Sequence, residues 1–249
     1  MRNVDVCLSP ELLHLYDVRG KIVVVVDILR ATSCMTTAIA HGMKAIIPVS
    51  TVEECKSYCA SGELGAAERN GKQEEGFDFG NSPFSFMTEE IKGETLAMTT
   101  TNGTKAINKS REAIQVLIGS FLNISALASY ISDQPHDVVI LCAGWKGRVN
   151  LEDTLFAGAL VDKLNGDFLC EHDASLVAHA LYKTSRSNLL GALANCSHYR
   201  RLSKLNIGKD IEFCMQEDVY EAIPVLEGDQ LVKLDVTATN DSLLPKEED

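Results

Sequence analysis

KIVVVVD, residues 21–27, is the stretch that decides the fold. A continuous β-branched run of this length is typical of a strand that is buried on both faces of a parallel sheet. In the stretch that follows, residues 30–42, small and apolar side chains recur at helical spacing, and Gly42 suits the position just after a helix. The sequence therefore predicts a central strand that leads into a helix.

Strand-like and helix-like segments alternate on either side of this unit. Further strands are expected at 4–8, 45–49, 96–99, 115–119 and 138–142, and further helices at 52–61, 122–132 and 152–165. This rhythm predicts an α/β fold, with three layers (α/β/α), a largely parallel or mixed central sheet and right-handed crossovers.

The pattern divides the chain into three parts. Residues 1–165 form the predicted α/β core, which carries the motifs discussed below. Residues 166–239 are expected to continue the same fold with helices at 171–185, 186–205 and 211–215 and a final strand at 230–236. Residues 240–249 are expected to form a flexible acidic tail.

Composition excludes several classes of partner. The chain has 249 residues, with 35 acidic against 23 basic side chains and a net charge of −12. Such a charge repels nucleic acid and anionic membranes, so neither is expected as a partner. We see neither a signal peptide nor an apolar run of about 18 residues, and we expect a cytoplasmic location.

The metal-binding side chains are scattered. The eight cysteines include no C-x-x-C pair, so buried reduced thiols are expected. The six histidines show no complete ligand set for zinc.

The loop Thr99-Thr-Thr-Asn-Gly-Thr104 is the strongest local signal of function. It joins a predicted strand to a helix and combines hydroxyl donors with a glycine and free backbone N–H groups, a pattern that suits a phosphate. The alternative interpretation is a simple turn and helix cap, since Thr, Asn and Gly are common in both.

Other polar residues also follow predicted strands, where the ligands of open α/β sheets bind. The acids are oxygen ligands of the kind that Mg²⁺ prefers: Asp27, Glu68, Asp78, Glu152 and Asp153. Each acid could instead cap a helix or hold a turn. The donors suit a multiply charged anion: Arg30, Arg69, Asn102, Gly103, Thr104, Ser120, Asn123 and Lys146.

Familiar phosphate chemistries fit poorly. A haloacid dehalogenase needs a second acid two positions after Asp27, where Leu29 stands, and no P-loop is present. The loop from Cys142 to Arg148 faintly resembles that of a cysteine phosphatase.

Taken together and in order, the motifs resemble those of the 2-phosphosulfolactate phosphatases, the ComB family. The motifs are Asp27-Ile-Leu-Arg-Ala-Thr32, Glu68-Arg-Asn-Gly71, Gly76-Phe-Asp-Phe-Gly-Asn-Ser-Pro83, Thr99–Thr104, Gly119-Ser-Phe-Leu-Asn123, Cys142-Ala-Gly144 and Leu151-Glu-Asp-Thr154. The resemblance implies a Mg²⁺-dependent phosphomonoesterase that converts 2-phospho-3-sulfolactate to sulfolactate and phosphate, a step of coenzyme M biosynthesis in methanogens. It also implies a three-layer α/β/α fold. The pathway does not transfer automatically, so a similar small phosphorylated 2-hydroxy acid is also an expected substrate.

On this resemblance we assign roles to particular residues. Catalysis is assigned to Asp27, Arg30, Glu68 and Asp153, and Mg²⁺ binding to Asp27, Glu68, Asp78 and Asp153. Binding of the phosphate and the rest of the substrate is assigned to Arg69, Asn81, Ser82, Thr100, Thr101, Asn102, Gly103, Thr104, Ser120, Asn123 and Lys146. The carboxylate and sulfonate groups are expected to contact Arg69, Asn81 and Lys146.

Two questions stay open at this level. The attacking group is either a metal-activated water or a carboxylate such as Asp27. A non-catalytic binding protein for small anionic metabolites is the alternative function, although such a protein gains nothing from several acids near its ligand unless a cation is present. The expected partner is a small phosphorylated, sulfonated hydroxy acid, and formation of a homo-oligomer is left open.

Overall fold

The computed structural model describes residues 1–194, 196–205 and 207–236. At its centre lies β2 (Ile22–Val26), which pairs in parallel with β7 (Gln115–Gly119) on one side and with β8 (Val138–Cys142) on the other. All five residues of β2 are buried. The central strand predicted from the valine run is confirmed.

The strands of the described residues form one mixed sheet in the order β5-β4-β6-β3-β11-β10-β7-β2-β8-β1-β9. Strands β7, β2, β8, β1 and β9 form one parallel group, and β3, β6 and β4 form a second. The hairpin β10–β11 joins the two groups and pairs antiparallel with each. The remaining strands are β1 (Arg2–Cys7), β3 (Ala45–Pro48), β4 (Leu64–Arg69), β5 (Lys72–Gln73), β6 (Thr95–Thr99), β9 (Phe168–Leu169), β10 (Pro224–Glu227) and β11 (Gln230–Lys233).

Helices cover both faces of the sheet, because successive side chains of a strand point to opposite faces. Ile22, Val24 and Val26 pack in one apolar cluster with α4 (Ile124–Ser132) and α5 (Leu151–Leu164). Val23 and Val25 belong to a second cluster with α1 (Ala31–Ala40) and α3 (Gly103–Lys109). A third, smaller cluster lies under α2 (Val52–Ala60). The expected α/β fold is confirmed.

Four strands of the sheet were not expected from the sequence: β4, β10 and the two-residue strands β5 and β9. Strand β4 was not predicted, since Leu-Gly-Ala-Ala-Glu-Arg contains few residues that favour strands. Strand β10 was also missed, whereas β11 corresponds to the final strand expected at 230–236. This hairpin lies inside the sheet, between β3 and β7, so the last described segment completes the core of the fold.

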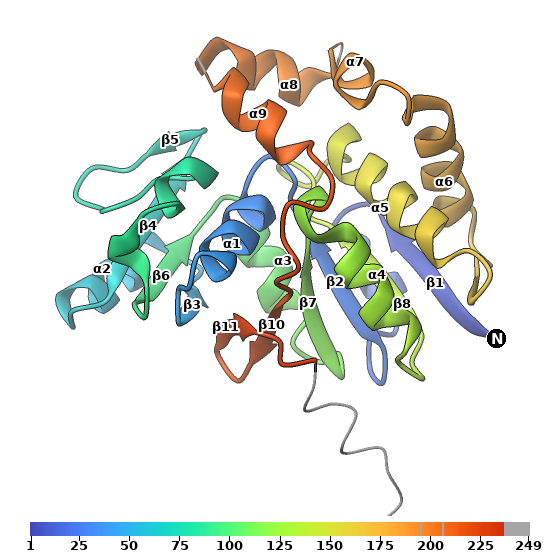
Figure 1. Ribbon diagram of the computed structural model, residues 1–249, viewed down its shortest axis with the longest axis horizontal. Helices are drawn as coiled ribbons and strands as arrows, with labels where there is room; N and C mark the ends of the chain where they lie inside the picture. The colour runs from blue at the N-terminus through green and yellow to red at the C-terminus, as the bar shows by residue number, and fades with distance from the viewer. Residues whose placement is uncertain (195, 206, 237–249) are drawn as a thin grey trace, which may run out of the picture.

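The helices after residue 170 begin beside α5 and continue to the end of the sheet. Helix α6 (Asp173–Ser185) packs on α5, and the helical stretch expected at 186–205 is broken into α7 (Leu189–Leu193), α8 (Ser197–Leu202) and the short η5 (Ser203–Leu205). Together with α9 (Gly208–Cys214), they pass over the end of the sheet where β2 leads into α1 (Figure 1).

Short 3-10 turns complete the described elements: η1 (Leu13–Leu15), η2 (Pro83–Phe86), η3 (Glu89–Ile91) and η4 (Phe121–Asn123). Within the described residues, no helix combines the length and the apolar character needed to cross a bilayer. The tail predicted at 240–249 lies outside the described residues.

Candidate active site

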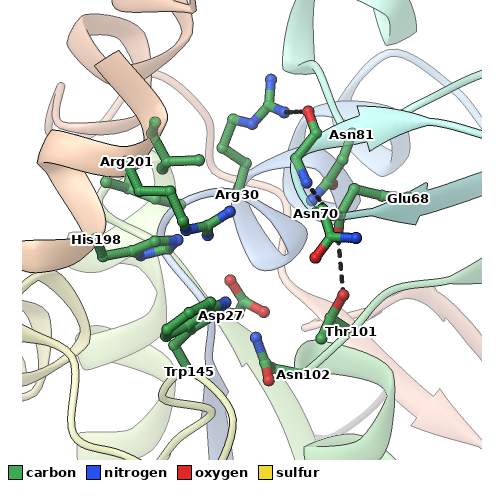
Figure 2. A pocket seen from close by; sticks show the side chains of 13 residues that line it. Asp27, Arg30, Glu68, Asn70, Asn81, Thr101, Asn102, Trp145, His198 and Arg201 are labelled. Carbon is green, nitrogen blue, oxygen red and sulfur yellow. Dashed lines mark hydrogen bonds between the residues drawn. The ribbon is translucent and has the colours of Figure 1, made fainter. Parts of the chain in front are cut away.

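The loops after β2, β4 and β6 meet α8 around one small cavity. Figure 2 shows Asp27 at its centre, with Glu68 and Asn81 on one side and His198 and Arg201 on the other. Of the residues assigned from sequence, the structure brings together Asp27, Arg30, Glu68, Asn81, Thr101 and Asn102. The other lining residues are Leu29, Asn70, Gly71, Trp145, His198, Arg201 and Leu202.

Asp27 is held at the point where β2 ends and α1 begins. Its backbone N–H donates to Thr32 Oγ1 (3.1 Å), and the N–H of Ala31, the first residue of α1, donates to its carboxylate. Burial raises the pKa of Asp27 to about 6; the nearby imidazole of His198 acts in the lowering direction and the charge of Glu68 in the raising direction. Two carboxylates therefore repel each other in one poorly solvated space.

Gly103 permits the close approach of the β6 loop to Asp27. A Cβ at this position would lie 3.0 Å from Asp27 Oδ2 and 2.7 Å from the Cβ of Ala31. Any larger residue would push α3 away from α1. A glycine is thus required at position 103 by close packing, and not only by the conformational freedom that glycine has in turns.

Glu68 is the second-last residue of β4 and joins two loops of the cavity. Its Oε1 accepts the N–H of Gly71 in the turn between β4 and β5, and its Oε2 accepts a bond from Thr101 Oγ1 (3.4 Å). Only 8% of the residue is exposed. This pair fixes the β4 turn to the β6 loop.

Arg30 lies in the cavity wall but is already paired. Its Nη1 forms a buried ion pair with Asp210 of α9, and its Nη2 donates to the carbonyl of Gly71 (3.3 Å). Since the charge of Asp210 compensates that of Arg30, this arginine mainly holds α9 and the β4–β5 turn around the cavity.

The roof of the cavity comes from α8 and the single tryptophan. The imidazole of His198 stacks on Trp145, with ring centroids 6.3 Å apart and an angle of 19° between the planes. The guanidinium carbon of Arg201 lies 4.8 Å from the centre of the same indole. The Nε of Arg201 is buried and has no hydrogen-bond partner among the described residues. Arg201 thus places a positive charge at the cavity, and its Nε–H is available to donate a hydrogen bond to a ligand.

Asp153 does not line the cavity, although it was assigned to both catalysis and metal binding. It is completely buried and accepts bonds from the N–H groups of Ile28 (2.9 Å) and Gly144 (3.0 Å) and from Asn150 Nδ2 (3.2 Å). Burial, followed by the charges of Glu152 and Asp27, raises the pKa of Asp153 well above its usual range. Its carboxyl group joins the loop after β2 to the loop after β8. This contact holds the backbone next to Asp27 in place.

The polar residues after β7 are used within the fold. Asn123 Oδ1 accepts the backbone N–H of Ser120 (3.0 Å), and Asn123 Nδ2 donates to the carbonyls of Ile118 and Ala222. Ser120 Oγ donates to Thr36 Oγ1 (3.1 Å). Both residues are completely buried and form a capping box, which the structure places away from the cavity.

Other assigned binding residues also have local partners. Thr100 and Thr104 bond each other at the start of α3, and Arg69 donates to the carbonyl of Glu68 (2.7 Å) and to Thr99 Oγ1 (3.1 Å). Ser82 precedes η2 and is not part of the cavity lining.

Lys146 lies on the outer side of the indole. Its Nζ lies 5.0 Å from the centre of the Trp145 ring, and its backbone N–H donates to Asn102 Oδ1 (3.2 Å). It lines a neighbouring depression with Thr101 and Asn102. Because Oδ1 of Asn102 is used in this way, the amide nitrogen is the group that faces Asp27 (Figure 2).

The set of four carboxylates predicted for Mg²⁺ is not assembled at one point. Asp78 is exposed and accepts the N–H of Gly65 (2.8 Å), outside the cavity. No cluster of three or more His, Cys, Asp or Glu side chains with metal-binding geometry occurs in the described ranges. Two acids do share the cavity with Asn81 Oδ1, which is buried and unpaired among the described residues. These oxygens fit Mg²⁺, which takes few carboxylates and fills its other positions with water and phosphate oxygens.

Cys142 does not support a cysteine-phosphatase mechanism. The thiol is completely buried in β8, and burial raises its pKa well above the ordinary value. A phosphatase nucleophile of this type needs the opposite, an exposed thiolate.

Comparison with known proteins agrees with the geometry. A model of the family described as 2-phosphosulpholactate phosphatase matches residues 7–229. The chain belongs to this family. It is 43% identical over 217 residues to a probable 2-phosphosulfolactate phosphatase of Caldanaerobacter subterraneus subsp. tengcongensis, covering 85% of this chain and 90% of the relative. Proteins with the same name from Clostridium acetobutylicum (39% identical, 89% and 96% covered) and Thermotoga petrophila (38%, 90% and 95%) are similar along almost their whole length.

As a member of the 2-phosphosulpholactate phosphatase family, the chain is a phosphoric monoester hydrolase. The family motifs lie in the first part of the chain. They therefore indicated the floor of the cavity, which is formed by the loops after β2, β4 and β6. The residues of the roof were not predicted. His198, Arg201 and Asp210 lie on short helices without a local motif, and the one usable sign was that Trp145 is the single tryptophan of the chain.

Proposed function

We propose that this protein hydrolyses 2-phospho-3-sulfolactate, or a similar small phosphorylated 2-hydroxy acid, to the hydroxy acid and inorganic phosphate with the help of Mg²⁺. One observation carries the proposal. Buried carboxylates and unpaired hydrogen-bonding groups, from loops far apart in sequence, line the same cavity in a chain of this family.

The oxygen-rich side of the cavity suits the cation. Asp27 and Glu68, together with Asn81 Oδ1, are the groups that would hold Mg²⁺. A bound Mg²⁺ would neutralise negative charge on the phosphoryl group. It would also relieve the repulsion between the two acids, which adds to the effect of burial in raising the pKa of Asp27.

The donor-rich side suits the anionic groups of the substrate. The amide nitrogen of Asn102 lies beside Asp27, where it can bind the phosphoryl oxygens. The free Nε of Arg201 can bind a carboxylate or sulfonate, the role first assigned to Arg69 and Lys146. Local donors thereby overcome the repulsion expected from a net charge of −12.

A panel of phosphate esters tests this function. Purified protein is incubated with 2-phospho-3-sulfolactate, 2-phospholactate and phosphoglycolate, with Mg²⁺ or with EDTA, and released phosphate is measured. With Mg²⁺ we expect phosphate to be released, fastest from 2-phospho-3-sulfolactate. In EDTA we expect this release to be lost. Saturable binding of the ester without phosphate release would favour the alternative, a binding protein for anionic metabolites. Release that is unchanged in EDTA would contradict the role of the cation.

Three expectations stay predictions. A place in coenzyme M biosynthesis depends on the organism, and the substrate panel addresses only the reaction. The cytoplasmic location and a homo-oligomer also stay predictions.

A further inference from the structure

His198 is a buried imidazole on the wall of the cavity, and the roles described above do not use it. It belongs to α8, is 7% exposed, and lines the cavity with Asp27 and Glu68 (Figure 2). An imidazole in this position can exchange a proton with a bound substrate.

Glu152 determines which ring nitrogen faces the cavity. The carboxylate of Glu152, which is completely buried in the first turn of α5, bonds to Nδ1 of His198. Because a carboxylate only accepts, Nδ1 carries a hydrogen. In the described part of the chain Nε2 makes no hydrogen bond. Nε2 is therefore the atom that can serve the substrate.

Trp145 fixes the plane of the imidazole. The two rings are nearly parallel, at 19°, and the guanidinium of Arg201 lies on the same indole. The ring is thus oriented by a stack as well as by an acid at Nδ1. Catalytic histidines in hydrolases are oriented by the same kind of buried carboxylate, which also stabilises the imidazolium form.

We propose that His198 is the general acid of the reaction, which protonates the alkoxide oxygen of the departing hydroxy acid, and that Glu152 and Trp145 are its positioning residues. This inference rests on the proposed phosphatase function. It supplies a proton donor for the leaving group, a role that is not among those assigned from the motifs.

The step balances in atoms and charge. The oxygen of a water molecule forms a bond to phosphorus as the bond between phosphorus and the ester oxygen breaks, and the electron pair of that bond stays on the ester oxygen. The proton of His198 Nε2 moves to this oxygen and yields the free hydroxyl group. A proton lost by the attacking water returns to the imidazole through solvent, so the next turnover begins with the same form of the enzyme.

The dependence of the rate on the leaving group tests this role. An alkyl phosphate such as 2-phospho-3-sulfolactate needs a proton on its leaving oxygen, whereas p-nitrophenyl phosphate releases a stable anion. In the full-length protein with Mg²⁺, we expect His198→Gln to lower kcat on the alkyl ester about 100- to 1000-fold. On p-nitrophenyl phosphate, kcat should fall less than about fivefold. Arg200→Gln, an exposed change on the same helix, serves as the control and should leave both rates unchanged.

Glu152→Gln provides a second variant that does not depend on the folding of His198→Gln. It preserves size and an acceptor oxygen but removes the charge that stabilises the imidazolium. We expect about a tenfold loss on the alkyl ester and little change on p-nitrophenyl phosphate. Equal losses on both esters, or no loss on the alkyl ester, would overturn the inference while leaving the phosphatase function intact. Failure of the unmodified protein to hydrolyse either ester would instead overturn the function itself.

Discussion

The loop after β6 and the loop after β7 contain similar side chains but have different roles. Thr101 and Asn102 line the cavity, and the amide nitrogen of Asn102 faces Asp27. Ser120 and Asn123 bond each other and the neighbouring backbone, so their polar groups are already satisfied. Residue type alone therefore does not mark a binding loop. A binding loop is marked instead by hydrogen-bonding groups that have no partner within the fold.

The acids show the same contrast. Asp153 accepts three bonds from the fold and lies outside the cavity, whereas Asp27 and Glu68 accept fewer bonds and face each other across it. A buried acid that is fully bonded stabilises the protein, and one that lacks compensation costs stability unless a ligand supplies it. Variants of cavity residues and of residues bonded within the fold should therefore behave differently.

Asp27→Asn should have the largest effect, on activity. We expect kcat on the preferred ester to fall by two to three orders of magnitude, equivalent to about 3 to 4 kcal/mol, because charge stabilisation at the phosphoryl group is lost. Steady-state phosphate release measures this loss. Asp78→Asn, a matched change at an exposed acid outside the cavity, should retain full activity. Equal rates in the two variants would remove Asp27 from the mechanism.

Asp153→Ala should act mainly on stability. It leaves the N–H groups of Ile28 and Gly144 without their acceptor, and we expect the free energy of unfolding to fall by about 3 kcal/mol. Urea denaturation monitored by circular dichroism gives this value. A stability equal to that of the unmodified protein would show that the three bonds are not needed to hold the loops.

The pH dependence of stability should single out Asp27. Its pKa is about 6 in the fold against 3.8 ordinarily, so the folded state keeps the proton to higher pH. Ionisation of Asp27 should therefore lower the free energy of unfolding of the metal-free protein by about 2 to 3 kcal/mol as pH rises from about 4 to about 6, a contribution that adds to those of other acids such as Asp153.

Asp27→Asn should remove this contribution and be the more stable protein at pH 7, with the difference vanishing near pH 4. Urea denaturation in EDTA across this range measures it. Parallel curves for the variant and the unmodified protein would contradict the assignment.

Replacement of Asn123 or Asn102 should give the smallest effects, the first on stability and the second on phosphate binding. Asn123→Ala should lower the free energy of unfolding by about 1 to 2 kcal/mol through loss of the capping box, with kcat/KM unchanged. Asn102→Ala should keep stability within about 0.5 kcal/mol but weaken inhibition by inorganic phosphate about tenfold. Denaturation and inhibition measured on both variants separate the roles; equal inhibition by phosphate would make the β6 loop a simple turn.

The floor of the cavity could be predicted because its signals are local. Asp27 follows a valine run that can only be a buried strand, and the Thr99–Thr104 motif lies at a strand end where ligands collect. Strands β4 and β10 were missed, since their sequences are short or poor in β-branched residues and depend on neighbours for their pairing.

The sequence by itself determined the α/β class, the central strand, the family and the loops that form the floor of the cavity. Tertiary structure decided which polar groups stay free, because neighbours distant in sequence satisfy several of the others, as Asp210 does for Arg30 and Ala222 for Asn123. It also brought His198 and Arg201 over Asp27, through the packing of α8 on Trp145. Periodicity and motifs describe neighbours along the chain, whereas the chemistry of this cavity depends on groups that meet only after the sheet and its covering helices have assembled.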